Sequence, residues 1–479
     1  MYPHPLILIF SPLQGEKRFI LVKIFHLEGE ILLKMKKNKL KNTLKVSYLD
    51  GLFASIMTGF SETFMTPYCL ALKGTTRQIA ALVSLPNLFS ALFQLKSSDM
   101  IARLKSRKKV VVTCVLLHAL MWVPIISIPY FPKINTGWYL IAFVILYTAL
   151  NGFAIPAWSS MMSDYIPGGS RGKYFGWRNR TLGLVVVLSA FIAGFILRYV
   201  NKNEVLFGFT LIFSIACVSR LVSWYFLTRM HEAKLKISKE AYFTFWDFIK
   251  RIRESNFAKF VFFVGSMSFT VNLASPFFAV YMLRDLNMDY MTYTVVVASA
   301  TLTTLIMMAV WGRYCDVVGN IRVLKTSSLF VPLIPLLWLF SSNVFYLIII
   351  QIFAGFFWAG FNLSASNFIY DAVSAPKRSR CVAYFNVVNG VAIFLGATLG
   401  GLLAGVLPAI KANRLLCLFS VSAAARAFVT YLFYNKVIEV RPRVKKVSSI
   451  ELFSSIFGVN PILGVSSGTL LPYGEKGEG

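Results

Sequence analysis

Residues 343–366 read NVFYLIIIQIFAGFFWAGFNLSAS, a stretch of 24 residues without a charged side chain. An α-helix rises about 1.5 Å per residue, so about 20 such residues cross the roughly 30 Å hydrocarbon core of a bilayer. The stretch therefore predicts a membrane-spanning helix. It is one of twelve comparable stretches, at residues 46–72, 78–95, 110–131, 137–161, 181–199, 205–227, 258–283, 290–311, 323–341, 343–366, 382–407 and 414–434.

The composition of the whole chain agrees with these stretches. Of its 479 residues, 57% are hydrophobic and 14% are charged, and the mean hydropathy is +0.65. A soluble protein carries about 25% charged residues, and a disordered chain is more polar still. Outer-membrane barrels alternate polar and apolar residues and lack long apolar runs. The sequence therefore predicts an all-α membrane protein with twelve transmembrane helices.

The loops divide these twelve stretches into six and six. The predicted segments are an N-terminal segment (1–45), a first half (46–227), a linker with an interfacial helix (228–257), a second half (258–434) and a tail (435–479). Residues 1–34 contain apolar runs too short to span a bilayer, and Met35 opens the basic stretch MKKNKLKN. Residues 1–34 are therefore expected to be an upstream extension or an interfacial helix.

The basic residues indicate the orientation of the chain. When both termini are placed on the same side, that side receives 39 of the 49 Lys and Arg, the other side receives eight, and Arg220 and Arg426 fall inside spans. Cytoplasmic loops carry such an excess, so both termini are predicted to be cytoplasmic in a cell membrane. The net charge of +29 is then explained by topology and by anionic lipid, without a nucleic-acid partner.

Several marks recur at a nearly constant offset along the chain. Thr66-Pro67-Tyr68 in the first span and Ser275-Pro276-Phe277 in the seventh are 209 residues apart. Asp164 and Asp371 end the fourth and tenth spans, and Arg220 and Arg426 are 206 residues apart. An even number of spans separates the copies, so the halves have the same topology, as in one class of secondary transporters.

The loop after the eighth span reads WGRYCDVVGNIRVL (311–324). Its spacing Gly312-x-x-x-Asp316-x-x-Gly319-x-x-Arg322 resembles the cytoplasmic signature of the major facilitator superfamily. The corresponding loop of the first half retains Arg103 and Arg107 but has Ala102 in place of the acid. Residues 163–179 also resemble uncharacterised prokaryotic members of this superfamily. The resemblance implies two pseudo-symmetric six-helix halves around one substrate cavity, which opens alternately to either side by a rocker-switch motion.

Three charged residues lie inside predicted spans, where a charge costs about 2.5–3.5 kcal/mol on insertion scales. They are Glu62, Arg220 and Arg426. Each Arg lies about eight residues, or about 12 Å, from the basic side, so its side chain could reach the interface. The repeat favours pairing instead. We predict that the pairs Asp164–Arg220 and Asp371–Arg426 belong to a cytoplasmic gate, together with the loop signature residues.

The remaining polar residues within spans supply candidates for the transport pathway. Glu62 is flanked by Ser61 and Thr63, which suits a hydrated cavity and a proton-coupling or substrate-cation site; the alternative is a carboxylate that reaches the outer interface. Asn87 and Asn272 are candidates for substrate contact or for bonding between helices. Pro67 and Pro276 interrupt helical hydrogen bonding and are candidate hinges.

These features predict a secondary active transporter of a small solute, with protons as a candidate coupling ion and with a monomeric state. The sequence leaves the substrate and the direction of transport open. The alternatives are a sensor or scaffold on the same fold and, less well supported, a lipid-modifying enzyme. Four scattered His and six scattered Cys give no ligand spacing for a metal, and the chain has no P-loop motif for ATP. No cofactor, metal or catalytic residue is therefore expected.

Overall fold

The computed structural model describes residues 42–131, 135–166, 171–200, 204–232, 245–250, 255–411, 413–441 and 447–456. Helices dominate these residues, which contain no strand beyond a single bridge between Ile410 and Asn413. Eleven of the described helices are long and apolar enough to cross a membrane. A further helical passage precedes them over residues 42–71, so the predicted all-α architecture is confirmed.

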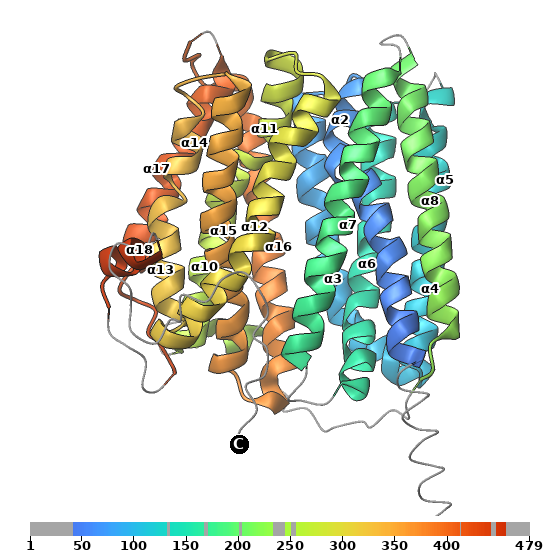
Figure 1. Cartoon of the computed structure of the whole chain (residues 1–479), viewed down its shortest axis with the longest axis horizontal. Coiled ribbons are helices and arrows are strands. Elements are labelled where there is room, and N and C mark those ends of the chain that lie inside the picture. Colours follow the sequence, from blue (N-terminus) through green and yellow to red (C-terminus); the bar gives the residue numbers. More distant parts are fainter. Residues whose placement is uncertain are drawn as a thin grey trace, which may run out of the picture.

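The N-terminal half contains six helical passages, drawn in blue to green in Figure 1. The first passage consists of a helix over residues 42–61, the short 3₁₀ segment η1 (Glu62–Phe64) and α2 (Met65–Ala71). The others are α3 (Thr76–Leu104), α4 (Arg107–Leu120) with α5 (Trp122–Ser127) and η2 (Ile128–Tyr130), α6 (Thr136–Tyr165), α7 (Arg171–Tyr199) and α8 (Val205–Arg229).

The C-terminal half repeats this order, in yellow to red in Figure 1. A short helix α9 (Phe245–Lys250) precedes it. The passages are α10 (Asn256–Asn272) with α11 (Ser275–Val280) and η6 (Tyr281–Asp285), α12 (Tyr290–Val318), α13 (Asn320–Phe330) with α14 (Leu333–Leu337), α15 (Val344–Ala372), α16 (Ala375–Val406) and α17 (Arg414–Phe433). The tail adds α18 (Ser449–Ile456).

Helices suit this environment because lipid offers no hydrogen-bond partners, so the backbone must satisfy its own donors and acceptors. Polar side chains begin several helices at the face opposite the basic loops. Asp289 accepts hydrogen bonds from the N–H groups of Met291 and Thr292 at 3.0 and 3.1 Å, and Asn343 begins α15 in the same way. Such caps fix where each helix starts.

The two spans that contain Pro67 and Pro276 are interrupted at these residues, as the sequence predicts. In the first span, the 3₁₀ segment Glu62–Phe64 lies directly before the turn that holds Pro67. In the seventh span, α10 ends at Asn272 and α11 begins at Ser275 with Pro276 in its first turn. The missing proline N–H and the steric demand of the ring on the preceding residue explain the two breaks.

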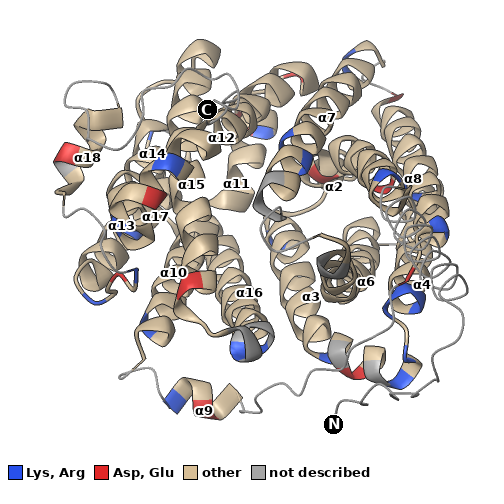
Figure 2. Ribbon diagram, turned by 60° about the horizontal axis from the view of Figure 1, so that its bottom comes forward, with Lys and Arg blue, Asp and Glu red and all other residues tan. Residues whose placement is uncertain are grey.

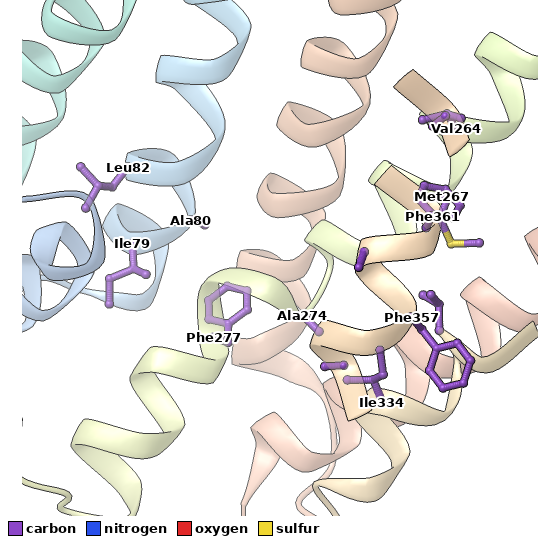
Figure 3. Packing of buried hydrophobic residues seen from close by; sticks show 14 of the residues in the cluster. Ile79, Ala80, Leu82, Val264, Met267, Ala274, Phe277, Ile334, Phe357 and Phe361 are labelled. Atoms are coloured by element: carbon purple, nitrogen blue, oxygen red, sulfur yellow. The ribbon is translucent and has the colours of Figure 1, made fainter. Parts of the chain in front are cut away.

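The two halves meet mainly along α3 with α16 and along α7 with α12. Small residues allow the close approach. A Cβ atom on Gly401 would lie 2.6 Å from the Cβ of Ala80, beside Phe277, and Figure 3 shows Phe277 close to Ala80. Without a hydrophobic driving force between helices in lipid, such van der Waals packing holds them together.

Charged residues lie mainly near the ends of the helices (Figure 2). The short helix α9 lies in the predicted linker, and its Phe248 is buried against Phe257 and Tyr384. This part of the predicted interfacial helix therefore packs on the C-terminal half. Residues 233–244 and 251–254 of the predicted linker lie outside the described residues.

Candidate functional site

A chain of buried polar side chains runs through the N-terminal half. The Nε of Arg220 in α8 donates to Nδ1 of His118 in α4 at 3.0 Å, and its Nη1 donates to Ser223 Oγ at 3.2 Å. Ser223 in turn donates to Oδ1 of Asp50 at 2.7 Å. Asp50 and Arg220 are only 5% and 6% exposed, and His118 is fully buried. The serine thus bridges an acid and a base that are both removed from water.

The hydrogen bond from Arg220 determines the state of His118. A guanidinium group donates and cannot accept, so Nδ1 of His118 must offer its lone pair. The ring is therefore neutral in this arrangement, with its proton on Nε2. It stacks on Tyr147 of α6 with ring centroids 4.1 Å apart. A neutral imidazole between a cation and an aromatic ring can accept a proton only if Arg220 moves away.

A second arginine approaches the same carboxylate. Arg178 in α7 interacts electrostatically with Asp50, and its Nη2 donates to the carbonyl of Ser47 at 3.3 Å. Its guanidinium lies 4.8 Å from the ring centroid of Trp158. Asp50, Arg178, Arg220 and Asn151 line a cavity of about 240 Å³. Charged side chains of both signs therefore line the cavity, so its buried charges have opposite charges nearby.

Glu62 is a further acid near Arg220. It begins η1, about ten residues or 15 Å from the end of α2, which places it near the middle of the span. Its side chain is exposed although the nearby Ser61 and Phe64 are fully buried. Arg220 and Tyr147 both interact with it electrostatically. Glu62 is therefore an uncovered carboxylate within electrostatic reach of the buried charges.

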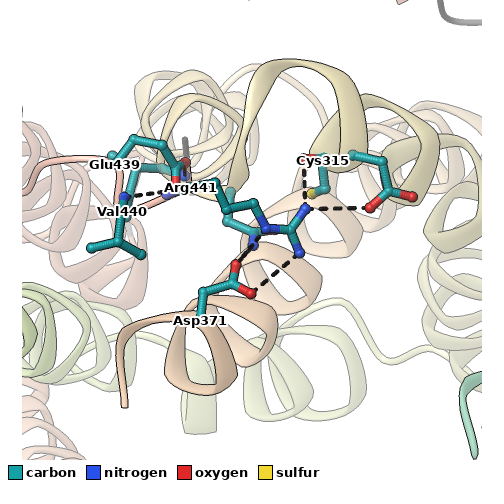
Figure 4. Close-up of polar contacts among 8 residues, drawn as sticks. Cys315, Asp371, Glu439, Val440 and Arg441 are labelled. Atoms are coloured by element: carbon teal, nitrogen blue, oxygen red, sulfur yellow. Dashed lines mark hydrogen bonds and ion pairs between the residues drawn. The ribbon is translucent and has the colours of Figure 1, made fainter. Parts of the chain in front are cut away.

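The predicted pairing of Asp371 with Arg426 is wrong. Asp371 accepts from Nε of Arg441 at 2.7 Å, and the same guanidinium lies 3.3 Å from Asp316 (Figure 4). Arg426 instead lies deep in the bundle and donates to Ser422 and two backbone carbonyls. Asp371 stands at the end of α15, so an arginine of the tail reaches it more easily than one held inside the core.

The sequence predicts Asp164 as the partner of Arg220. The side chain of Asp164 lies outside the described residues, so the Asp164–Arg220 pair stays a prediction. The contacts of Arg220 lead through Ser223 to Asp50. The predicted first span begins at residue 46, which would place Asp50 close to its end. The helix is described from residue 42 onward, so Asp50 lies more than two turns inside it.

The loop signature surrounds a backbone turn between α12 and α13. Gly319 has a φ of +89°, a conformation that glycine adopts without strain. A Cβ atom there would also collide with the carboxylate of Glu439, which accepts from the backbone N–H of Ile321 at 2.8 Å. The glycine thus lets a tail carboxylate cap α13. Gly312 lies inside α12, Asp316 is mostly exposed, and Arg322 is half-buried in α13.

The first half has the same cap. Glu232, which follows α8, accepts from Ser106 Oγ at 2.6 Å and from the backbone N–H of Arg107 at 2.7 Å. Glu232 and Glu439 are 207 residues apart, so they belong to the repeat. Arg107 is buried and donates to Ser160 of α6, whereas Arg103 is exposed. The degenerate first loop has therefore kept its helix cap.

The two candidate amides each bond to their own helix. Asn87 donates to the carbonyl of Val83, and Asn272 donates to that of Ser268, both at 2.8 Å. Asn272 also lines a cavity of about 430 Å³ between α10, α15 and α16. Asn87 is exposed, and its carbonyl lies at the contact of α3 with Gly390 of α16.

Four members of these networks were not predicted from the sequence. Arg178 and Arg441 fall in segments whose basic residues indicate topology, and Asp50 lies close to the predicted start of the first span. His118 was noted only as one of four scattered histidines, although it stands in the apolar stretch VVVTCVLLHALMW (110–122). An ionisable residue within a span is a functional candidate by default, and that rule would have found it.

Comparison with known proteins gives one family. The model of the Major Facilitator Superfamily matches residues 51–278 and 260–473, one match for each half. A curated relative, the "Vacuolar basic amino acid transporter 1" of Saccharomyces cerevisiae, is 28% identical over 180 residues. That alignment covers 36% of this chain and 31% of the relative, so the similarity spans about a third of the relative's length.

Solved structures share the fold at low sequence identity. The nucleoside transporter NupG has a TM-score of 0.64 and 12% identity, covering 83% of this chain and 99% of its own. The D-xylose-proton symporter has a TM-score of 0.65 and 12% identity, covering 85% of this chain and 99% of its own. A bacterial homologue of the human lysosomal transporter Spinster, in an inward-facing conformation, has a TM-score of 0.57 and 12% identity, covering 84% and 95%.

Proposed function

This chain belongs to the major facilitator superfamily, and we propose that the buried charges of its N-terminal half couple solute movement to protons. It is a secondary active transporter built from two six-helix halves. In such proteins the halves rock against each other about a central site. What remains to be assigned is the force that drives the motion and the residues that respond to it.

The observation that carries the proposal is the exposed carboxylate of Glu62 within electrostatic reach of Arg220, which belongs to the buried chain Asp50–Ser223–Arg220–His118. When Glu62 is ionised, it competes with Asp50 for the positive charge of Arg220. Protonation of Glu62 removes that competition, so Arg220 moves toward Ser223 and Asp50. Arg220 belongs to α8 and Glu62 to the first span, so the shift acts on the packing of two helices.

We propose Pro67 and Pro276 as hinges at which the first and seventh spans bend when Arg220 moves. Each lies directly beyond a break in its span, where backbone hydrogen bonds are already missing. At the basic face, the loop signature, Arg103, Arg107, Asp371 and their tail contacts form the proposed gate. In this gate Arg441, rather than Arg426, is the partner of Asp371.

A second role for Glu62 is binding a positively charged group of the solute. The name of the yeast relative, a basic amino acid transporter, motivates this candidate, although only about a third of that protein is matched. An exposed carboxylate at mid-span suits an ammonium or guanidinium group as well as a proton. Both roles use the same carboxylate, and they predict different results when Glu62 loses its charge.

Glu62→Gln separates the two roles because it keeps the size of the side chain and removes its titration. The protein is reconstituted in liposomes that enclose a pH dye, with a solute found by thermal-shift screening. Under proton coupling, Glu62→Gln stops solute-dependent proton flux and pH-driven accumulation, while counterflow exchange of the solute continues. If Glu62 holds a cation of the solute, exchange is lost as well. Unchanged proton flux would rule out both roles.

Glu204→Gln is the matched control. Glu204 is an exposed acid directly before α8 at the face opposite the basic loops, outside the buried network. We expect its proton flux and exchange to equal those of the wild type. A loss in this variant would show that the assay responds to surface charge.

We also propose that the basic face is cytoplasmic and that the protein resides in the cell membrane. The distribution of 39 against eight basic residues supports this orientation. Cysteines introduced at Lys105 and Arg77, both exposed, test it with a membrane-impermeant reagent on intact cells. Labelling is expected at 77 and not at 105, and the reverse result would invert the topology.

A further inference from the structure

Arg426 in α17 is the counterpart of Arg220 but has no acid beside it among the described residues. Its side chain is 2% exposed. Nε donates to Ser422 Oγ at 3.2 Å, and Nη1 and Nη2 donate to the carbonyls of Val331 and Val271 at 3.4 Å each. All three acceptors are neutral, and no acidic side chain of the described residues contacts it. A guanidinium has five N–H donors, so two remain for another acceptor.

The repeat shows which acid is missing. The offset of 209 residues between Pro67 and Pro276 places Val271 at the position of Glu62. The contacts agree with this correspondence, because Arg220 interacts with Glu62 and Arg426 donates to the backbone of Val271. The loop signature, in which Ala102 corresponds to Asp316, gives an offset of 214 that places Pro332 opposite His118, and the offset of 209 places Val387 opposite Arg178. The second half has therefore kept the buried cation without the charged side chains that surround it in the first.

The cation stands at the wall of a cavity. Arg426 lines a space of about 480 Å³ between α11, α12, α14 and α15, a size typical of small-molecule sites. Aromatic rings of Phe278, Tyr293, Trp338 and Trp358 form much of the wall, and Gln351 and Thr304 add polar groups. Ser275 and Thr301, also in the wall, are exposed. The site thus joins one buried positive charge to a largely apolar surface.

The cavity is connected to the elements that we expect to move. Trp358 and Val271 also line the cavity that contains Asn272, so the two spaces share a wall. Tyr293 reaches across to the N-terminal half and donates to the carbonyl of Thr63 at 3.1 Å, next to Glu62. A molecule in the cavity would therefore lie against a residue that links the two halves.

We propose that this cavity binds the carboxylate group of a small organic solute through Arg426, with the apolar part of the solute against the aromatic wall. A buried charge without a partner is costly, and a carboxylate that accepts two guanidinium N–H groups supplies the missing partner. The inference deepens the proposed function by naming the class of solute, and it rests on the protein being a transporter. In the second half the solute takes the place that an acidic side chain has in the first.

Binding is tested on the purified full-length protein in detergent by thermal shift and then by titration. The probes are the standard L-amino acids and benzoate, each beside its carboxamide, with inorganic phosphate and chloride as further anions. At least one carboxylate should bind at least tenfold more tightly than its carboxamide. No binding by any carboxylate, equal binding of the carboxamide, or binding of inorganic phosphate alone would overturn the proposal.

Two substitutions place the site at Arg426. Arg426→Gln should weaken carboxylate binding at least tenfold, while Arg426→Lys keeps part of it. Val271→Glu should weaken it equally by giving Arg426 a partner from within the chain, and Val271→Gln is its control for size. If the carboxylate binds Arg426→Gln and Val271→Glu as tightly as the wild type, it binds elsewhere and the proposal fails.

Failure of this inference and failure of the proposed function give different results. Binding in detergent needs neither a proton gradient nor movement of the halves. A protein that accumulates another solute with a pH gradient but binds no carboxylate keeps its proposed function and loses this site. A protein that binds a carboxylate through Arg426 but moves no solute keeps the site and loses the function.

Discussion

The two halves bury an arginine at corresponding places and surround it differently. Around Arg220 the first half assembles Asp50, Ser223 and His118, with Glu62 nearby. Around Arg426 the second half supplies a serine, two backbone carbonyls and a cavity. The folds of the halves match, so the difference comes from a few side chains at equivalent positions. A repeat can thus keep its architecture while one copy surrounds its buried arginine with acidic side chains and the other places its buried arginine beside a cavity.

At the face that carries the basic loops the two halves are alike, because both have kept the same helix cap. Glu232 and Glu439 each follow the last helix of a half and cap the helix that begins its third span. Capping serves the fold, since the first N–H groups of a helix lack partners within it. Features needed for folding are therefore shared between the halves, whereas the charges around the buried arginines differ.

The largest difference between the halves is expected when each arginine is neutralised. Arg220→Gln leaves Asp50 without its bridged partner in a buried site, and breaking such a pair costs about 3–5 kcal/mol. Arg426→Gln removes a buried charge that has no acid, so the cost should stay near the roughly 1 kcal/mol of its hydrogen bonds. The free energy of unfolding in mixed detergent micelles measures both.

Arg220→Lys and Arg426→Lys serve as controls that keep the charge. Similar losses of stability for the two Gln variants would contradict the contrast between a paired and an unpaired arginine.

A double-mutant cycle sharpens the comparison within the first half. Asp50→Asn and Arg220→Gln each leave one charge buried, whereas the double variant removes both. The double variant should lie closer to the wild type than either single variant, with a coupling energy of about 2 kcal/mol. The same cycle for Asp371 and Arg426 should give no coupling. If the Asp50 and Arg220 effects simply add, the serine bridge does not join them.

The smallest effect is expected where the halves agree. Glu232→Gln and Glu439→Gln keep a side-chain oxygen but lose the charge at the start of a helix, and each should cost about 1 kcal/mol or less. The two losses should be equal within about 0.5 kcal/mol, as unfolding or hydrogen exchange at residues 106–109 and 320–323 would measure. A loss of stability in one half alone would mean that the two caps contribute unequally although their geometry is the same.

Much of the fold was predictable because the bilayer imposes strong rules on a sequence. Apolar stretches of sufficient length indicated the spans, and the offsets of Pro67 with Pro276 and of Arg220 with Arg426 indicated the two halves. The loop signature indicated the family, and Glu62 was correctly singled out as an acid inside a span. The pairing of charges was harder, because an offset indicates equivalent positions and says nothing of which side chains face each other.

The sequence by itself determined the twelve helical passages, their grouping and the superfamily, since length, hydropathy and repetition are properties of local segments. The tertiary structure decided that Arg178 and Arg441 are network residues rather than loop charges, and that Asp371 pairs with Arg441. It also decided that Arg426 lines a cavity without an acid among the described residues. Each of these depends on how helices far apart in the chain rotate toward one another, and hydropathy carries no information about that rotation in a helix that is apolar on every side.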